Sequence, residues 1–256
     1  MKKRILRILF IFLALLPITA FAHFILFPQE TKSILIDFSG FRKEGRLYFN
    51  RETKKSDVEY IQFLIDSASN RVSRFWGGRM ADPKFIYCDQ DADFKNYSIN
   101  HEAPAVTYCK LGTYVVLSKV GADLDIISHE ISHTELYARI GFYRWNFVIP
   151  DWFKHGLAMQ NDYRHYYSTD TLIARTDHFK NMPDITQFKT SAQFYNGTID
   201  QIMLRYMVAK YVVGRWYSRE KLDQLIRDLS TGKSFDESFN GPTHKLLFVS
   251  RSTDSR

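Results

Sequence analysis

The sequence has little cysteine and no apolar run of transmembrane length. Its 256 residues include two cysteines, and the apolar run from Ile8 to Ile18 is shorter than the roughly 20 residues that a spanning helix needs. It contains no internal repeat and no low-complexity segment. The charged share of 25% is ordinary for globular proteins, which argues against global disorder. With 45% hydrophobic residues, the chain can bury the core of one domain or of two lobes of one compact unit.

The N-terminus has the pattern of a secretory signal peptide. Four basic residues start the chain, an apolar run follows, and Ala20 and Ala22 supply the small residues that precede a cleavage site. The pattern predicts a signal peptide over residues 1–22 and a periplasmic or secreted protein. The alternative is an uncleaved membrane anchor, because Phe24–Phe27 extends the apolar stretch.

Charge gives no support for a nucleic-acid partner. The formal net charge falls from +7 to +3 when the four basic residues of the signal segment are removed. A mature chain with so small an excess of positive charge lacks the basic footprint of a nucleic-acid-binding domain.

The two cysteines, Cys88 and Cys109, are candidates for a disulfide in an oxidising compartment. Closing a loop of that length would stabilise the fold by about 3 kcal/mol on the chain-entropy model. Two free thiols are the alternative. A cysteine metal site is disfavoured, because the metal-binding pattern of the chain lies in its histidines.

The order of predicted elements indicates an α+β fold. Strands are predicted at Ser33–Phe38, Arg46–Phe49, Lys84–Cys88, Ala105–Cys109 and Thr113–Ser118, with a helix at Ser56–Trp76 and a polar loop at Asp89–Asn100. Only helices follow, at Asp123–Ile140, Pro150–Asp162, Ile199–Tyr217 and Arg219–Leu229, with irregular chain over 164–197.

We therefore expect a small mixed or antiparallel sheet lobe with a central helix over residues 23–141 and a helical lobe over 142–242. Residues 243–256 are expected to form a loose tail.

The central helix carries the pattern His-Glu-x-x-His at His129, Glu130 and His133. Residues four apart lie about 40° apart on a helix, one turn along the same face. Two imidazoles placed in this way can reach one tetrahedral zinc ion, and the intervening glutamate can reach a water molecule there. The alternative is a surface helix with two incidental histidines.

A third ligand must come from outside this helix. Glu135 faces away from the two histidines, and no glutamate lies between it and Glu220. A ligand from that interval must be aspartate or histidine, and His155 opens the next predicted helix. Asp151 and Asp162 are the alternative ligands.

These motifs resemble the gluzincin metallopeptidases of clan MA, above all their compact peptidase MA-like members. The resemblance rests on His-Glu-x-x-His followed by Pro-x-Trp-x-x-ligand-Gly-Leu-Ala at Pro150–Ala158, and it extends loosely over residues 84–240. The family normally has glutamate where this chain has His155. The resemblance implies His129, His133 and His155 as zinc ligands, with Glu130 as general base. Three-histidine zinc sites are catalytically competent, so we interpret the exchange as a variant site.

The resemblance also implies hydrolysis of a peptide bond in a peptide or protein substrate. A tyrosine or histidine from the helical lobe would stabilise the oxyanion, with Tyr195 as the first candidate, Tyr206 as the second and His178 behind them. The strand Thr113–Ser118 resembles the edge strand that binds extended substrate in the family; an ordinary interior strand is the alternative.

Two aspartates stand four residues before a predicted ligand. Asp125 precedes His129 and Asp151 precedes His155, so each is a candidate to accept a hydrogen bond from its imidazole. Alternatively, each simply favours the first turn of its helix.

Two other functions stay open at the level of sequence. One is a catalytically silent, peptidase-like binding module, which the unusual His155 favours and the intact Glu130 disfavours. The other is a zinc amidase that acts on cell-wall peptides.

Overall fold

The computed structural model describes residue 4, residues 17–19 and residues 21–239. Most of the predicted signal segment and the whole predicted tail at 243–256 lie outside these residues. Across the described chain, no helix combines the length and the apolar character that crossing a bilayer requires.

The chain forms two compact units. One comprises residues 1–54 and 84–120, and we call it the sheet unit; the other comprises residues 55–83 and 121–256, and we call it the helical unit. The predicted division into domains at residue 141 stays a prediction.

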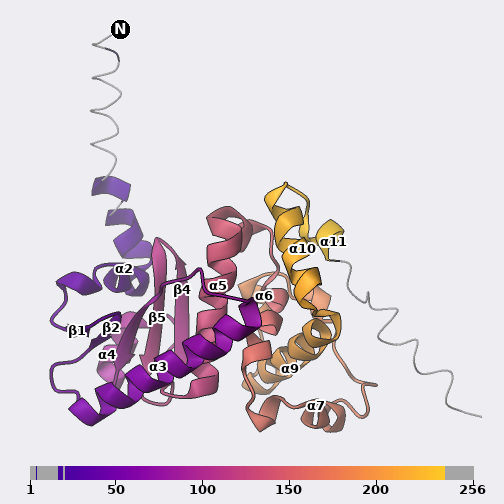
Figure 1. Cartoon of the computed structure of the whole chain (residues 1–256), viewed down its shortest axis with the longest axis horizontal. Coiled ribbons are helices and arrows are strands. Elements are labelled where there is room, and N and C mark those ends of the chain that lie inside the picture. Colours follow the sequence, from indigo (N-terminus) through magenta and orange to yellow (C-terminus); the bar gives the residue numbers. More distant parts are fainter. Residues whose placement is uncertain (1–3, 5–16, 20, 240–256) are drawn as a thin grey trace, which may run out of the picture. The chain divides into compact units, whose positions relative to one another are not determined.

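The sheet unit holds a five-stranded mixed sheet (Figure 1). Its strands are β1 (Arg42–Glu44), β2 (Leu47–Phe49), β3 (Lys84–Cys88), β4 (Ala105–Lys110) and β5 (Gly112–Ser118), in the order β1-β2-β3-β5-β4. β2, β3 and β5 run parallel, whereas β1 and β4 pair antiparallel with their neighbours. The predicted α+β class with a mixed sheet is confirmed.

One face of this sheet carries a buried cluster. Every second residue of a strand points to the same face, and paired residues of neighbouring strands share that face. Ile86 and Val116 are such a pair, and both belong to the cluster. The helix α4 (Asp91–Tyr97) adds Phe94 and Tyr97 to the cluster, and α2 (Pro28–Ile34) contacts α4. Burial of these apolar rings holds the unit together.

Two predictions of secondary structure in this unit are wrong. Ser33–Phe38 lies in the end of α2 and a 3₁₀ turn at Ile36–Phe38, not in a strand. A short apolar run fits a strand and a buried helix equally well, and the helix-start signal was Pro28 at the first helical position. The predicted loop Asp89–Asn100 contains the helix α4. Phe94 and Tyr97 are its buried residues, and their spacing of three places them on the same face of the helix.

Of the two alternatives for the strand Thr113–Ser118, the interior strand is confirmed and the edge strand is wrong. β5 pairs with β3 on one side and β4 on the other, so the strand Thr113–Ser118 lies inside the sheet. Its backbone groups are taken up by two neighbours, which rules out pairing with an extended substrate along either side.

The helical unit contains the remaining helices of the described chain. They are α3 (Lys55–Trp76), α5 (Leu124–Phe147), α6 (Asp151–Ala158), α7 (Thr169–Arg175), α8 (Ser191–Phe194), α9 (Ile199–Trp216), α10 (Arg219–Ser230) and α11 (Phe235–Ser238). The four predicted helices after residue 120 are confirmed, and the stretch 164–197 holds short helices between turns. Figure 1 shows α6 and α9 side by side, which their many mutual contacts bear out.

α5 starts where the sequence predicts but continues past its predicted end at Ile140. The carboxylate of Asp123 accepts hydrogen bonds from the backbone N–H groups of Asp125 and Ile126, at 2.9 and 3.0 Å. Gly141 has a φ of +76°, which breaks the helical path there, and the chain continues as helix to Phe147.

A buried carboxylate fixes α5 within its unit. Glu135 has no exposed surface and accepts hydrogen bonds from the backbone of Met80 and Ala81 at 3.0–3.3 Å. Arg139 and Arg79 form ion pairs with the same carboxylate. A buried carboxylate with two cationic partners and backbone donors is fully satisfied, and it ties the middle of α5 to the segment after α3.

The predicted disulfide is absent. Cys88 pairs with Ser118 of β5, and Cys109 pairs with Thr113 of the same strand. Their strands lie on opposite sides of β5, about 10 Å apart, and the two positions are offset along it by about 17 Å. Since bridged cysteines need Cα atoms within about 7 Å, the two thiols cannot join in this fold.

Both thiols should therefore react in the unfolded chain without prior reduction. Protein denatured in an alkylating agent should gain the mass of two alkyl groups, and pretreatment with a reductant should change nothing. The folded protein should resist alkylation at Cys88, because burial raises the pKa of its thiol well above the usual range. Alkylation that required a reductant would contradict this arrangement.

Candidate metal centre

Two of the three predicted ligands come from adjacent turns of α5. His129 and His133 are both buried, with exposures of 7% and 6%. The helix around them is buried on most sides, and the hydroxyls of Ser128 and Ser132 bond back to carbonyls four residues earlier. The N-cap at Asp123 and the carboxylate of Glu135 hold the helix on either side of the pair.

The third predicted ligand comes from α6. His155 is followed by Gly156, where a side chain has no room: a Cβ atom would lie 2.6 Å from the backbone oxygen of Ala209 and 2.6 Å from a methyl of Val213. The glycine therefore lets α6 approach the backbone of α9 closely. Pro150 precedes the first residue of α6 and has the extended conformation typical of that position.

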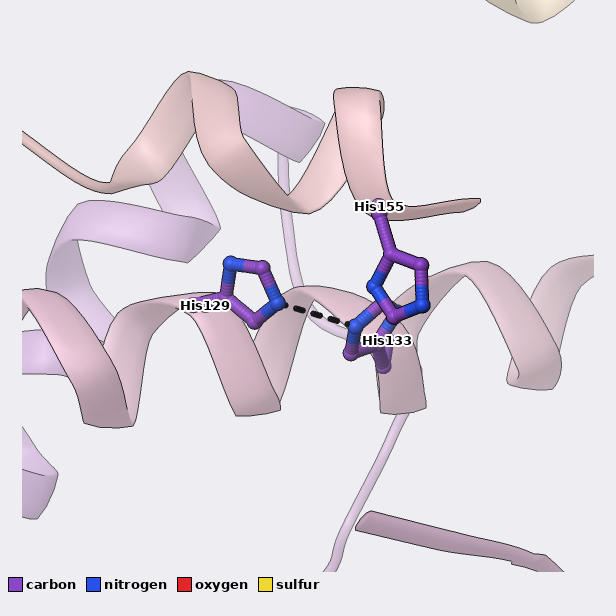
Figure 2. Close-up of side chains that lie close together, drawn as sticks. All are labelled: His129, His133 and His155. Atoms are coloured by element: carbon purple, nitrogen blue, oxygen red, sulfur yellow. Dashed lines mark hydrogen bonds between the residues drawn. The ribbon is translucent and has the colours of Figure 1, made fainter. Parts of the chain in front are cut away.

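The three imidazoles converge, as Figure 2 shows. Each offers one ring nitrogen, and these nitrogens lie within 4.8 Å of one another. The Nε2 atoms of His129 and His133 are 3.1 Å apart, and the ring of His155 stands 5.0 Å from that of His133, centroid to centroid. The predicted grouping of His129, His133 and His155 is thus present in the structure.

Burial keeps these rings uncharged. It lowers the pKa of His129, His133 and His155 well below the usual value for histidine. The neighbouring rings lower each pKa further, and so does the ammonium of Lys154 for His133 and His155. Neutral imidazole is the form that binds a metal.

The arrangement fits a metal ion. Two ligand nitrogens of a tetrahedral zinc ion lie about 3.3 Å apart, given Zn–N bonds of about 2.0–2.1 Å. The Nε2 atoms of His129 and His133 are separated by 3.1 Å, close to that value. The three Nδ1 atoms are buried and have no hydrogen-bond partner in the described chain. These three histidines could hold a metal ion, whose identity the geometry leaves open.

Tyr195 lies at the third histidine. Its hydroxyl is 3.0 Å from Nε2 of His155 and 2.9 Å from the hydroxyl of Tyr206 on α9. Burial raises the pKa of both phenols, and the charge of Glu130 raises them further. Both tyrosines named from the sequence therefore lie at the histidine group, and at physiological pH both are protonated.

Glu130 is half-buried on α5 between the two histidines. Its negative charge raises the pKa of Tyr195 and of Tyr206, so its carboxylate lies within electrostatic range of both hydroxyls. The two phenols in turn lie at the histidine group through the contact of Tyr195 with His155.

The two predicted aspartate partners are engaged elsewhere. Asp125 forms an ion pair with Arg71 and accepts from the backbone of Tyr163. Asp151 forms an ion pair with Lys154 at 2.6 Å and accepts from the hydroxyl of Ser191. Neither accepts from an imidazole in these contacts: each lies in the first turn of its helix and pairs with a cation.

The alternative ligands do not join the histidine group either. Asp162 is fully buried, and Arg164 holds both of its carboxylate oxygens. The group contains neither Asp151 nor Asp162, and it does not include His178, which lies in a turn of positive φ at residues 177–179.

Sequence reasoning missed the rings that pack around the histidines. Trp145 lies edge-on to His133 at 5.8 Å, and the ammonium of Lys154 stands 4.8 Å over the Trp145 ring. Phe194 lies against His155 at 4.6 Å. Trp145 follows the break at Gly141, and no local pattern indicates that such a ring reaches a ligand.

Comparisons with known proteins add no family. No protein-family model matches the chain, and none of the curated proteins matches it.

Zinc-reconstituted protein should carry about one metal ion per chain, measured by mass spectrometry of the purified protein. His129→Ala, His133→Ala and His155→Ala should each lose most of it, because two imidazoles leave half of a tetrahedral shell unfilled. His165→Ala is the matched control, since His165 is exposed and outside the group, and it should keep its metal. Wild-type protein that held no zinc after reconstitution would contradict the assignment.

Proposed function

We propose that this protein is a zinc-dependent metallopeptidase. The observation that carries the proposal is the convergence of three uncharged imidazoles, two buried and one half-buried, with a half-buried glutamate next to the first of them on α5. Zinc bound there would act as a Lewis acid that polarises a carbonyl and acidifies a water molecule. The residues of the chain then bind the ion, orient the substrate and move protons.

Glu130 is the proposed general base. It directly follows a ligand on α5, so its carboxylate reaches the region where the three rings converge. It would take a proton from the attacking water and deliver it to the leaving nitrogen. A group of histidines that served only to stabilise the fold would have no use for a carboxylate in this place.

The sequence resemblance to gluzincins supports the same proposal. The Gly156 of the second motif lies where α6 meets α9, and the histidine before it joins the pair on α5. The motif Pro150–Ala158 thus positions His155 beside the two histidines of α5, and the resemblance implies the same role for this motif. We propose zinc as the ion because a neutral all-imidazole set suits zinc and excludes magnesium and calcium as preferred partners.

We further propose that the protein acts outside the cytoplasm. The basic start, the apolar run and the small residues at Ala20 and Ala22 support export and cleavage. N-terminal sequencing of the protein recovered from the periplasm or the medium should begin at His23. Recovery of the whole protein with the membrane fraction and an intact N-terminus would favour the anchored alternative.

Glu130→Gln should abolish hydrolysis and leave the metal in place. Zinc-loaded wild type should cleave casein or a peptide library, and the variant should be slower by about 10²–10⁴-fold, the usual contribution of a general base. Zinc content should be equal in the two proteins, because a metal ligand is not changed. Glu59→Gln is the matched control, since Glu59 is an exposed glutamate of α3 and should leave the rate unchanged.

The other outcomes separate the alternatives. Cleavage of muropeptides without cleavage of casein would indicate the cell-wall amidase. Zinc binding without turnover on either substrate would indicate the silent binding module. A Glu130→Gln variant as active as the wild type would remove Glu130 from the role of base.

A further inference from the structure

The two ring nitrogens of His155 have different surroundings. Nε2 lies 3.0 Å from the hydroxyl of Tyr195. Nδ1 is buried and has no hydrogen-bond partner in the described chain. His129 and His133 direct their Nε2 atoms at each other, 3.1 Å apart, and their Nδ1 atoms are likewise buried without a partner in the described chain, so His155 differs from them in what its Nε2 meets.

This difference decides which nitrogen of His155 suits a metal. A neutral imidazole has one N–H donor and one lone pair. If Nε2 carries the hydrogen and donates it to Tyr195, the lone pair of Nδ1 is left for a metal ion and both nitrogens are satisfied. If the metal took Nε2, the hydrogen bond between Nε2 and the hydroxyl of Tyr195 would be lost.

The hydroxyl of Tyr195 is itself held in place. It lies 2.9 Å from the hydroxyl of Tyr206, which projects from α9. Tyr195 directly follows α8, a single turn closed at its start by a capping box between Thr190 and Gln193. Phe194 packs against the ring of His155. The phenol is thus fixed both by its own segment and by α9.

The group that meets Nε2 of His155 is a phenol, whereas a carboxylate often supports a metal-binding histidine. Metal ligands of this type donate their second ring nitrogen to a carboxylate, a carbonyl or water. Asp151, the nearest acid in sequence, is taken up by Lys154 and Ser191. A phenol oxygen is left as the acceptor, and it has two lone pairs to offer.

We propose that Tyr195 is a positioning residue: it accepts a hydrogen bond from Nε2–H of His155 and so presents Nδ1 of that ring to the metal, while Tyr206 holds Tyr195. This proposal rests on the metal binding of the proposed function but not on peptide hydrolysis. It replaces the role of oxyanion donor that the sequence resemblance implies for Tyr195. His129 and His133 bind through Nε2 and His155 through Nδ1.

Metal affinity is the first test. In competition with a chromophoric chelator, zinc should bind Tyr195→Phe about 10–100-fold more weakly than wild type, the usual effect of removing such a partner. Tyr206→Phe should weaken binding less, and the double variant should be no weaker than Tyr195→Phe, because both changes break one chain of hydrogen bonds. Tyr167→Phe is the control and should be unchanged, since the Tyr167 hydroxyl bonds to Met203.

A tautomer measurement is the second test. Long-range ¹H–¹⁵N correlation spectra of the zinc-loaded protein, labelled at histidine, should show His155 with its hydrogen on Nε2 and the other two ligands with hydrogen on Nδ1. Metal at Nε2 of His155 would overturn the proposal. So would a Tyr195→Phe variant that binds zinc like the wild type but turns over peptide more slowly, because that pattern belongs to an oxyanion donor.

The two proposals fail separately. If zinc binds and no peptide is cleaved, the proposed function fails, while the affinity and the tautomer still test the role of Tyr195. If wild type binds zinc and cleaves peptide with His155 bound through Nε2, only the positioning role fails.

Discussion

Three imidazoles that lie within ligand distance of one another, two of them buried and one half-buried, must remain uncharged, and the rest of the helical unit depends on this constraint. Burial lowers the pKa of each ring, and each neighbouring ring opposes protonation of the next. The rings of His129 and His133 lie on one face of α5, so the helix itself brings them together. The third must be brought from another helix, so α5 has to be held still and α6 has to approach it. The buried ion pairs of Glu135 serve the first need, and the close contact of α6 with α9 serves the second.

The fold followed from the sequence wherever one pattern was long enough to exclude the others. The long helices have periodicities that fit a single structure. The failures lie in short segments. Ser33–Phe38 offered an apolar run that fits strand and helix alike, and α4 is only seven residues long with two buried rings. The inner place of β5 in the sheet was beyond reach for another reason: strand order depends on contacts far apart in the chain.

The metal centre followed from the sequence to the extent that its spacing is local. His129 and His133 lie one turn apart, and His155 was found through the motif that ends in Gly-Leu-Ala. The contacts of these rings could not be foreseen in the same way. Tyr195 comes 40 residues after His155 and meets Tyr206 through two different helical segments, and Trp145 reaches His133 only after the chain bends at Gly141. The spacing of Asp151 and His155 was misleading, because a cation three residues along the helix, Lys154, takes the carboxylate first.

Gly156 shows where the third-ligand motif is strict. At the position before it, either a carboxylate or an imidazole could point from the same turn toward a metal ion. The glycine itself cannot be exchanged without moving α6, because the backbone of Ala209 fills the space that a side chain would need. The position without functional groups is therefore the one under the tighter steric constraint. A search for related chains would be better anchored on this glycine and on the spacing from His133 than on the chemical identity of the third ligand.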